Sequence, residues 1–141
     1  MSVLKGFLQP SPMGATKEVV ISERFKGEDG KPLPFKVRAI DQATNSELIK
    51  LSTREKKGRN GQMIKDLNRA EYTNRLILAC VTEPNMKDTE LCQYYGVVDP
   101  LMVPEKMLSV GEYSRLSDAI MEINDLGEEA AEAIEEEAKN S

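Results

Sequence analysis

The chain has 141 residues, of which 30% are charged, and it contains no histidine and no tryptophan. This length suits one domain, and a hydrophobic fraction of 40% with seven methionines predicts a modest aliphatic core. The lack of histidine excludes Ser–His and Cys–His catalytic pairs and every zinc site that needs an imidazole ligand. We therefore expect a binding protein that is not an enzyme and uses no cofactor or metal.

The formal net charge of −5 comes from the C-terminal end of the chain. Residues 128–141 hold six glutamates and one lysine, whereas residues 1–127 hold 18 acidic and 18 basic side chains. A neutral body lacks the basic excess of general nucleic-acid binders, so a nucleic-acid partner is not expected. Like charges repel in the tail, which predicts a flexible segment or a frayed helix.

Targeting and cysteine signals are weak. There is no apolar run long enough to cross a bilayer and no apolar core of a signal peptide near the N-terminus, so we expect no membrane partner and a cytoplasmic location.

Cys80 and Cys92 do not have zinc-ligand spacing. Two reduced, half-buried thiols are the favoured interpretation, and a disulfide or a reactive thiol is the alternative.

The first fifteen residues contain two glycines, at 6 and 14, and two prolines, at 10 and 12. They predict an irregular arm over residues 1–15. Its large apolar residues Leu4, Phe7 and Leu8 would dock on the body or on a neighbouring chain, unless the arm is simply a frayed terminus.

Alternating apolar and polar residues over 17–25 and 35–40 predict two strands. The segment 27–32 between them is rich in turn residues, which favours a β-hairpin. Two strands alone are marginally stable in water, so helices must cover the apolar face of this hairpin.

Thr44 and Glu47 have the spacing of a capping box, which predicts a helix over residues 45–57. The chain then becomes basic and rich in glycine over residues 54–65. Binding of an acidic partner or of RNA is one interpretation. We favour a solvated hinge, because no aromatic residue is interleaved for base stacking.

Asn68 and Glu71 predict the start of a further helix, which ends by Glu83 ahead of Pro84. Residues on one face of this helix are expected in the core. They are Tyr72, Leu76, Ala79 and Cys80.

Three more helices are predicted after Pro84. Asp88 can cap a short helix that closes at Gly96, and Pro104 suits the first turn of another that runs through Leu108. Ser109 then caps a longer helix that Gly127 interrupts. Its apolar residues follow a coiled-coil-like spacing that more often marks core than interface. They are Tyr113, Leu116, Ile120 and Ile123.

These elements predict an α+β fold in which an N-terminal β-hairpin packs against a bundle of about five helices. The expected organisation is an irregular arm over 1–15, a single domain over 16–127 and a flexible acidic tail over 128–141.

Three segments also carry a family resemblance: KEVVISERFKGEDGKPLPFKVRAID, RLILACVTEPNMKDTELCQYYGVVDPLMVPEKML and GEYSRLSDAIMEIN. Together they resemble the XkdN-like phage tail assembly chaperones over residues 8–125. The resemblance implies a protein of the host bacterial cytoplasm that binds the tape measure protein until tail tube subunits polymerise around it. It also implies absence from the mature particle, and the tail tube protein and further copies of the chain as possible partners.

The resemblance further suggests a longer form made by translational frameshifting. Ala138, Lys139 and Asn140 could be encoded as GCA-AAA-AAC, which contains a slippery heptamer. Two other functions are alternatives to the chaperone: a structural tail or connector component that stays in the particle and, less favoured, a nucleic-acid-binding regulator using residues 54–65.

Contact residues are expected where apolar side chains lie between prolines and turns. Such a run is either a core plug or a docking edge, and one of two adjacent tyrosines on a helix must point away from the core. The candidate partner-binding residues are Tyr94, Tyr95, Val98, Pro100, Leu101, Met102 and Val103.

Overall fold

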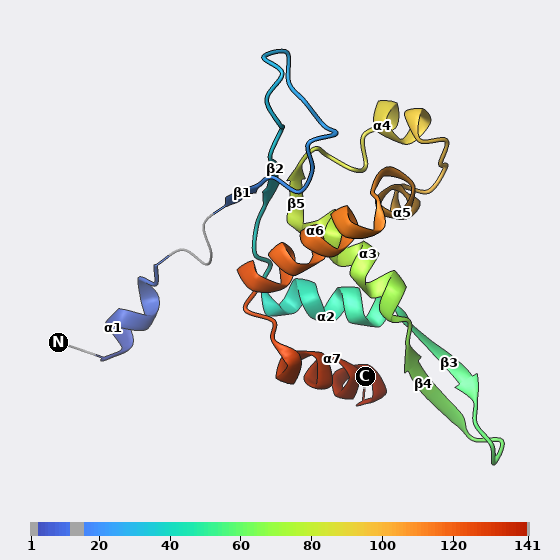
Figure 1. Ribbon diagram of the computed structural model, residues 1–141. Coiled ribbons are helices and arrows are strands. Elements are labelled where there is room, and N and C mark those ends of the chain that lie inside the picture. Colours follow the sequence, from blue (N-terminus) through green and yellow to red (C-terminus); the bar gives the residue numbers. More distant parts are fainter. Residues whose placement is uncertain (1–2, 12–15, 141) are drawn as a thin grey trace.

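The computed structural model describes residues 3–11 and 16–140, and the expectation for Pro12 and Gly14 lies outside these ranges. The described chain is an α+β fold (Figure 1). Its elements in order are α1 (Val3–Leu8), β1 (Lys17–Val19), β2 (Phe35–Val37), α2 (Gln42–Leu51), β3 (Thr53–Lys57), β4 (Met63–Leu67), α3 (Arg69–Cys80), β5 (Val81–Glu83), α4 (Thr89–Tyr94), the 3-10 helix η1 (Pro100–Met102), α5 (Val103–Met107), α6 (Val110–Ile123) and α7 (Glu128–Asn140).

The predicted N-terminal hairpin is present but shorter than expected. Strands β1 and β2 pair antiparallel, and Phe35 and Val37 of β2 point into the core. The sheet also contains β5, which pairs with the other edge of β2 in the order β1-β2-β5. The expectation that residues 81–83 end a helix is therefore wrong, because their pairing with β2 is a tertiary contact that leaves no local signal.

Helices α3 and α6 pack against each other and supply much of the core, as their apolar stripes predicted. Tyr72, Leu76 and Cys80 are buried on α3, and Leu116 and Ile120 are buried on α6. These residues recur at three- and four-residue intervals, so each helix presents one apolar face.

The predicted helix starts after residue 67 are confirmed. Asn68 accepts a hydrogen bond from Glu71 N, Asp88 accepts one from Leu91 N, and Ser109 forms a complete capping box with Glu112. Side-chain oxygens at these positions satisfy backbone N–H groups that have no partner within the helix.

Residues 53–67 form a second β-hairpin, which corrects the predicted helix over 45–57 and the predicted hinge over 54–65. Helix α2 begins after Asp41, whose side chain accepts from Thr44 N, and it ends at Leu51. Five residue pairs then join β3 to β4. Figure 1 shows this hairpin projecting from the body beyond α2 and α3. Its turn places Gly61 at a φ of 76°, a conformation that favours glycine.

The acidic tail forms helix α7, which corrects the expectation of a flexible segment. Ile134 and Ala138 are buried, and α7 packs against β4 and α2 (Figure 1). The burial of this narrow apolar face offsets the repulsion between its glutamates.

Residues 3–8 form helix α1, which corrects the expectation of an irregular arm over these positions. No residue of α1 is buried, so Leu4, Phe7 and Leu8 do not dock on the body, and their docking on a neighbouring chain stays a prediction. In the described ranges, no helix is both long and apolar enough to cross a membrane.

Candidate partner-binding surfaces

The two cysteines are buried in the core. Burial raises the pKa of the Cys80 thiol. The hydrogen bond from Asn124 Nδ2 and the charge of Arg38 lower this pKa, but by less. Cys92 donates to Met86 O at 3.6 Å. Thiols buried in apolar surroundings are inert, so both cysteines serve as small core residues. Among the described residues there is also no group of three metal-ligating side chains of the His, Cys, Asp or Glu type.

The predicted contact residues lie in α4, in the loop that follows it, in η1 and at the start of α5. Three of them have exposed side chains: Tyr94 (79% exposed), Val98, which is fully exposed, and Met102 (44%). Pro100 and Leu101 are half-buried. We call these five residues the α4–η1 edge.

Hydrogen bonds hold the backbone of the α4–η1 edge in place. Helix α4 ends at Tyr94, the chain reverses at Gly96 with a φ of 68°, and Val97 N donates to Cys92 O. Asp99 then caps η1, because its side chain accepts from Leu101 N at 3.0 Å. A fixed loop loses little entropy on binding, which favours a docking role for its exposed side chains.

The two adjacent tyrosines differ in exposure, as the sequence predicted. Tyr95 is half-buried and Tyr94 is exposed, and their rings meet edge to face with centroids 4.8 Å apart. Partial burial raises the pKa of Tyr95. Tyr95 therefore supports Tyr94 from the side of the core, and the aromatic ring of Tyr94 stays exposed.

Val103 is buried in the core, with no exposed surface. This is a correction to its expected role in direct contact, since a side chain without exposed area cannot touch a partner of the folded chain. Helix α5 begins at this residue and turns its side chain inward.

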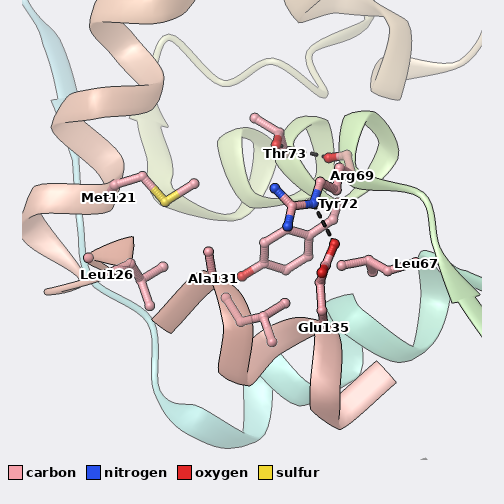
Figure 2. A pocket seen from close by; sticks show the side chains of 10 residues that line it. Leu67, Arg69, Tyr72, Thr73, Met121, Leu126, Ala131 and Glu135 are labelled. Atoms are coloured by element: carbon pink, nitrogen blue, oxygen red, sulfur yellow. Dashed lines mark hydrogen bonds and ion pairs between the residues drawn. The ribbon is translucent and has the colours of Figure 1, made fainter. Parts of the chain in front are cut away.

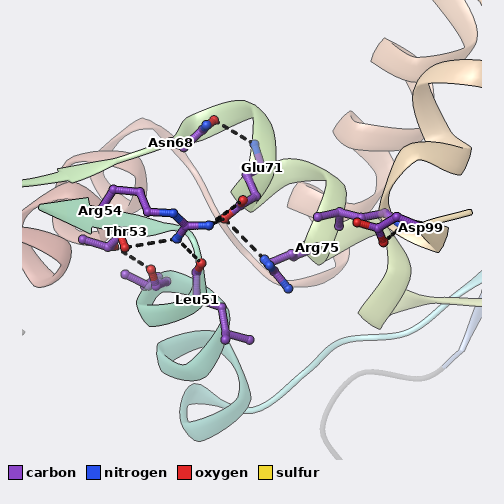
Figure 3. A network of polar contacts seen from close by, with 9 residues as sticks. Leu51, Thr53, Arg54, Asn68, Glu71, Arg75 and Asp99 are labelled. Atoms are coloured by element: carbon purple, nitrogen blue, oxygen red, sulfur yellow. Dashed lines mark hydrogen bonds and ion pairs between the residues drawn. The ribbon is translucent and has the colours of Figure 1, made fainter.

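A polar network anchors the projecting β3–β4 hairpin (Figure 3). The guanidinium of Arg54 donates to Leu51 O at 2.7 Å and to the carboxylate of Glu71 at 2.9 Å. Arg75 forms an ion pair with the same carboxylate at 3.5 Å. These contacts join the start of β3 to the end of α2 and the first turn of α3. The hairpin itself exposes Met63 and Ile64.

An apolar groove lies under α7 (Figure 2), and the sequence did not indicate it. Leu67, Tyr72, Met121 and Leu126 line it from β4, α3, α6 and the loop after α6, and Ala131 of α7 faces it. A cavity of about 100 Å³, open to solvent, remains between α7 and these side chains. The spacing of Ala131, Ile134 and Ala138 was the available signal, but the surrounding glutamates obscured it.

Comparisons with known proteins extend over nearly the whole chain. The family model described as phage XkdN-like tail assembly chaperone protein matches residues 4–139. The uncharacterized protein YqbN of Bacillus subtilis (strain 168) is 35% identical over 124 residues, covering 87% of this chain and 83% of YqbN. The phage-like element PBSX protein XkdN of the same organism is 33% identical over 124 residues, with the same two coverages.

A crystal structure of YqbN shares the fold. Its TM-score is 0.71 at 28% sequence identity, and the match covers 86% of this chain and 95% of that chain.

Proposed function

The chain belongs to the phage XkdN-like family of tail assembly chaperones, and we propose that it acts by binding a tape measure protein during tail assembly. The observation that carries this proposal is the family match, which runs from α1 into α7. Under the proposal the chain works in the host cytoplasm, meets tail tube subunits as they polymerise, and is absent from the finished particle.

The physical properties of the partner explain why a chaperone is needed. A tape measure protein is long and largely helical, and its apolar stripes would aggregate before the tube encloses them. A short helix-binding surface, repeated by many copies along that length, would mask the stripes. The α4–η1 edge supports this role, because Tyr94, Val98 and Met102 present apolar surface on a fixed backbone.

The test is co-expression of the chain with the tape measure protein encoded in its gene cluster. We expect soluble co-purification with the wild type and its loss with Val98→Asp or Met102→Asp. Val110→Asp is the matched control, because Val110 is also highly exposed but lies at the start of α6, where an acidic side chain is tolerated. Insoluble tape measure protein in the presence of the wild type would contradict the proposal.

Mass spectrometry of purified particles separates this function from that of a structural component. A chaperone is missing from the particles, whereas a tail or connector subunit is present in a fixed ratio to the tube subunits. Stoichiometric incorporation of the chain would therefore replace the chaperone proposal by the structural one.

We also propose that frameshifting at the codons of Ala138, Lys139 and Asn140 produces a longer form. The support is that these amino acids permit a slippery heptamer. An AAG codon for Lys139 would rule out this site, and peptides that continue past Asn140 in the shifted frame would support it.

A further inference from the structure

We infer that the groove under α7 is a binding site for an amphipathic helix, and that α7 occupies it as an intramolecular substitute for a partner. The inference deepens the proposed function and rests on it for the partner's identity, a helical segment of the tape measure protein. It assigns to this groove a second contact with the helix's apolar stripe, in addition to the α4–η1 edge.

The groove has the shape and chemistry that a helix needs. Leu67 and Tyr72 form one side, Met121 and Leu126 form the other, and Figure 2 shows Ala131 of α7 between them. Most of the lining is apolar, and Arg69, Thr73 and Glu135 supply its polar atoms, so an amphipathic helix buries its apolar stripe there.

Helix α7 fills this groove incompletely. Ala131, Ile134 and Ala138 follow the i, i+3, i+7 spacing of a docking face, and Ile134 and Ala138 are buried. Ala131 is exposed, and it is one of the residues that border an open cavity of about 100 Å³ which α7 leaves unfilled. A helix with leucine at this position would fill the space and make additional dispersion contacts.

Polar contacts define the rest of the recognition pattern. Glu135 accepts from Arg69 Nε at 2.6 Å, and Glu137 accepts from Gln42 Nε2 at 3.2 Å. Glu135 lies four residues after Ala131. The preferred partner helix therefore has a large apolar residue at position i, a second apolar residue at i+3, an acidic residue at i+4 and a small apolar residue at i+7.

Several features make α7 displaceable. Its six glutamates repel one another, and within the described residues Glu137 Oε2 is buried without a hydrogen-bond partner. The segment that joins α6 to α7 passes through Asp125 at a φ of 56° and Gly127. This turn lies outside both helices, so α7 can leave the groove without any change in α6.

The direct experiment measures binding of a synthetic peptide of residues 128–140 that carries Ala131→Leu. The full-length Ile134→Asp variant should bind this peptide at least about tenfold more tightly than the wild type, because its own α7 competes less well. A peptide with both Ala131→Leu and Ile134→Asp is the negative control. Equal binding of the first peptide to both proteins, or no binding to either, would overturn the inference.

The second experiment does not depend on the folding of Ile134→Asp. Ala131→Leu in the full-length chain should raise its melting temperature and lower both peptide binding and the recovery of the tape measure protein. Ala133→Leu is the matched control, since Ala133 is exposed on the same helix, as Ala131 is, but does not line the groove. Equal behaviour of the two leucine variants would overturn the inference.

The two proposals fail in different ways. If the peptide does not bind but the wild type still recovers the tape measure protein, the groove inference is wrong and the proposed function stands. If the peptide binds as expected but neither the wild type nor a variant recovers the tape measure protein, the groove binds helices but the assigned partner is wrong.

Discussion

The carboxylate of Glu112 accepts two hydrogen bonds from the guanidinium of Arg24, which lies 88 residues earlier in the chain. Arg24 also donates to Met107 O at 2.9 Å, and Glu112 accepts from its own N-cap, Ser109 N, at 2.8 Å. One carboxylate thus completes the capping box of α6 and ties the loop before β2 to it. The Glu112 side chain is only 4% exposed, so this contact closes one side of the core.

Glu112 should make stability dependent on acid pH. The hydrogen bonds from Arg24 hold the pKa of Glu112 well below its ordinary value of 4.5. A carboxyl group whose pKa is lower in the folded protein than in the unfolded chain stabilises the fold at pH values above the unfolded-state pKa. This contribution is lost as the pH falls below that pKa. Urea unfolding should therefore show a smaller loss of stability between neutral and acid pH in Glu112→Gln than in the wild type. Because Arg24 is more than half exposed, the difference is modest. Parallel pH profiles for the two proteins would contradict this role.

Tyr72→Phe should destabilise the fold by about 1–2 kcal/mol, because the Tyr72 hydroxyl donates to the buried side chain of Asn45 and its loss leaves an acceptor unsatisfied. Burial raises the pKa of Tyr72 to about 12. A raised phenol pKa stabilises the fold at neutral pH, and this contribution is lost as the pH rises above the ordinary value of 10.0. The phenolate absorbance difference between wild type and variant should place this titration near pH 12. A transition close to pH 10 would show that Tyr72 is solvated.

Asn68→Ala should lower the free energy of unfolding by about 1 kcal/mol. The side chain of Asn68 accepts from Glu71 N at 3.0 Å and caps α3, which carries much of the core. Asn60→Ala is the control, since Asn60 lies exposed in the turn between β3 and β4. Denaturant midpoints of the two variants check the expectation, and equal midpoints would show that the cap contributes nothing.

Arg54→Ala should loosen the β3–β4 hairpin without unfolding the body. Arg54 is exposed, but it joins β3 to Leu51 O and to Glu71 on α3. Hydrogen exchange of amides over residues 55–66 should become faster, while exchange in α3 stays slow. Arg59→Ala, at the tip of the hairpin, should leave both rates unchanged. Faster exchange throughout the chain would instead place Arg54 among the residues that support the whole fold.

Much of the fold between residues 68 and 123 could be predicted, because its signals are local. Asn68, Asp88 and Ser109 cap helices at the positions that the sequence indicated, and Gly96 reverses the chain after α4 in the left-handed region. Caps and helical stripes act within a few residues, so a single sequence contains them.

The candidate site was predicted in part for the same reason. The tyrosine pair and the turn residues indicated an apolar edge between α4 and η1, and Tyr94 and Val98 are exposed there. The burial of Val103 depends on which neighbours cover it, and the groove under α7 exists only where β4, α3 and α6 converge. Such convergence has no signature in any one segment.

The sequence by itself determined the absence of histidine chemistry, the helix starts after residue 67 and the core stripes of α3 and α6, because each follows from residue type and short spacing. Only the tertiary structure decided that residues 81–83 become a strand, that residues 53–67 form a hairpin and that the acidic tail is a docked helix. In two of these cases the stabilising partner lies elsewhere in the chain: β2 for β5, and β4 and α2 for α7. In the third, β3 pairs with β4 across their own turn. Contacts of that kind override local propensity, because burial and strand pairing contribute more than the preferences of a few residues.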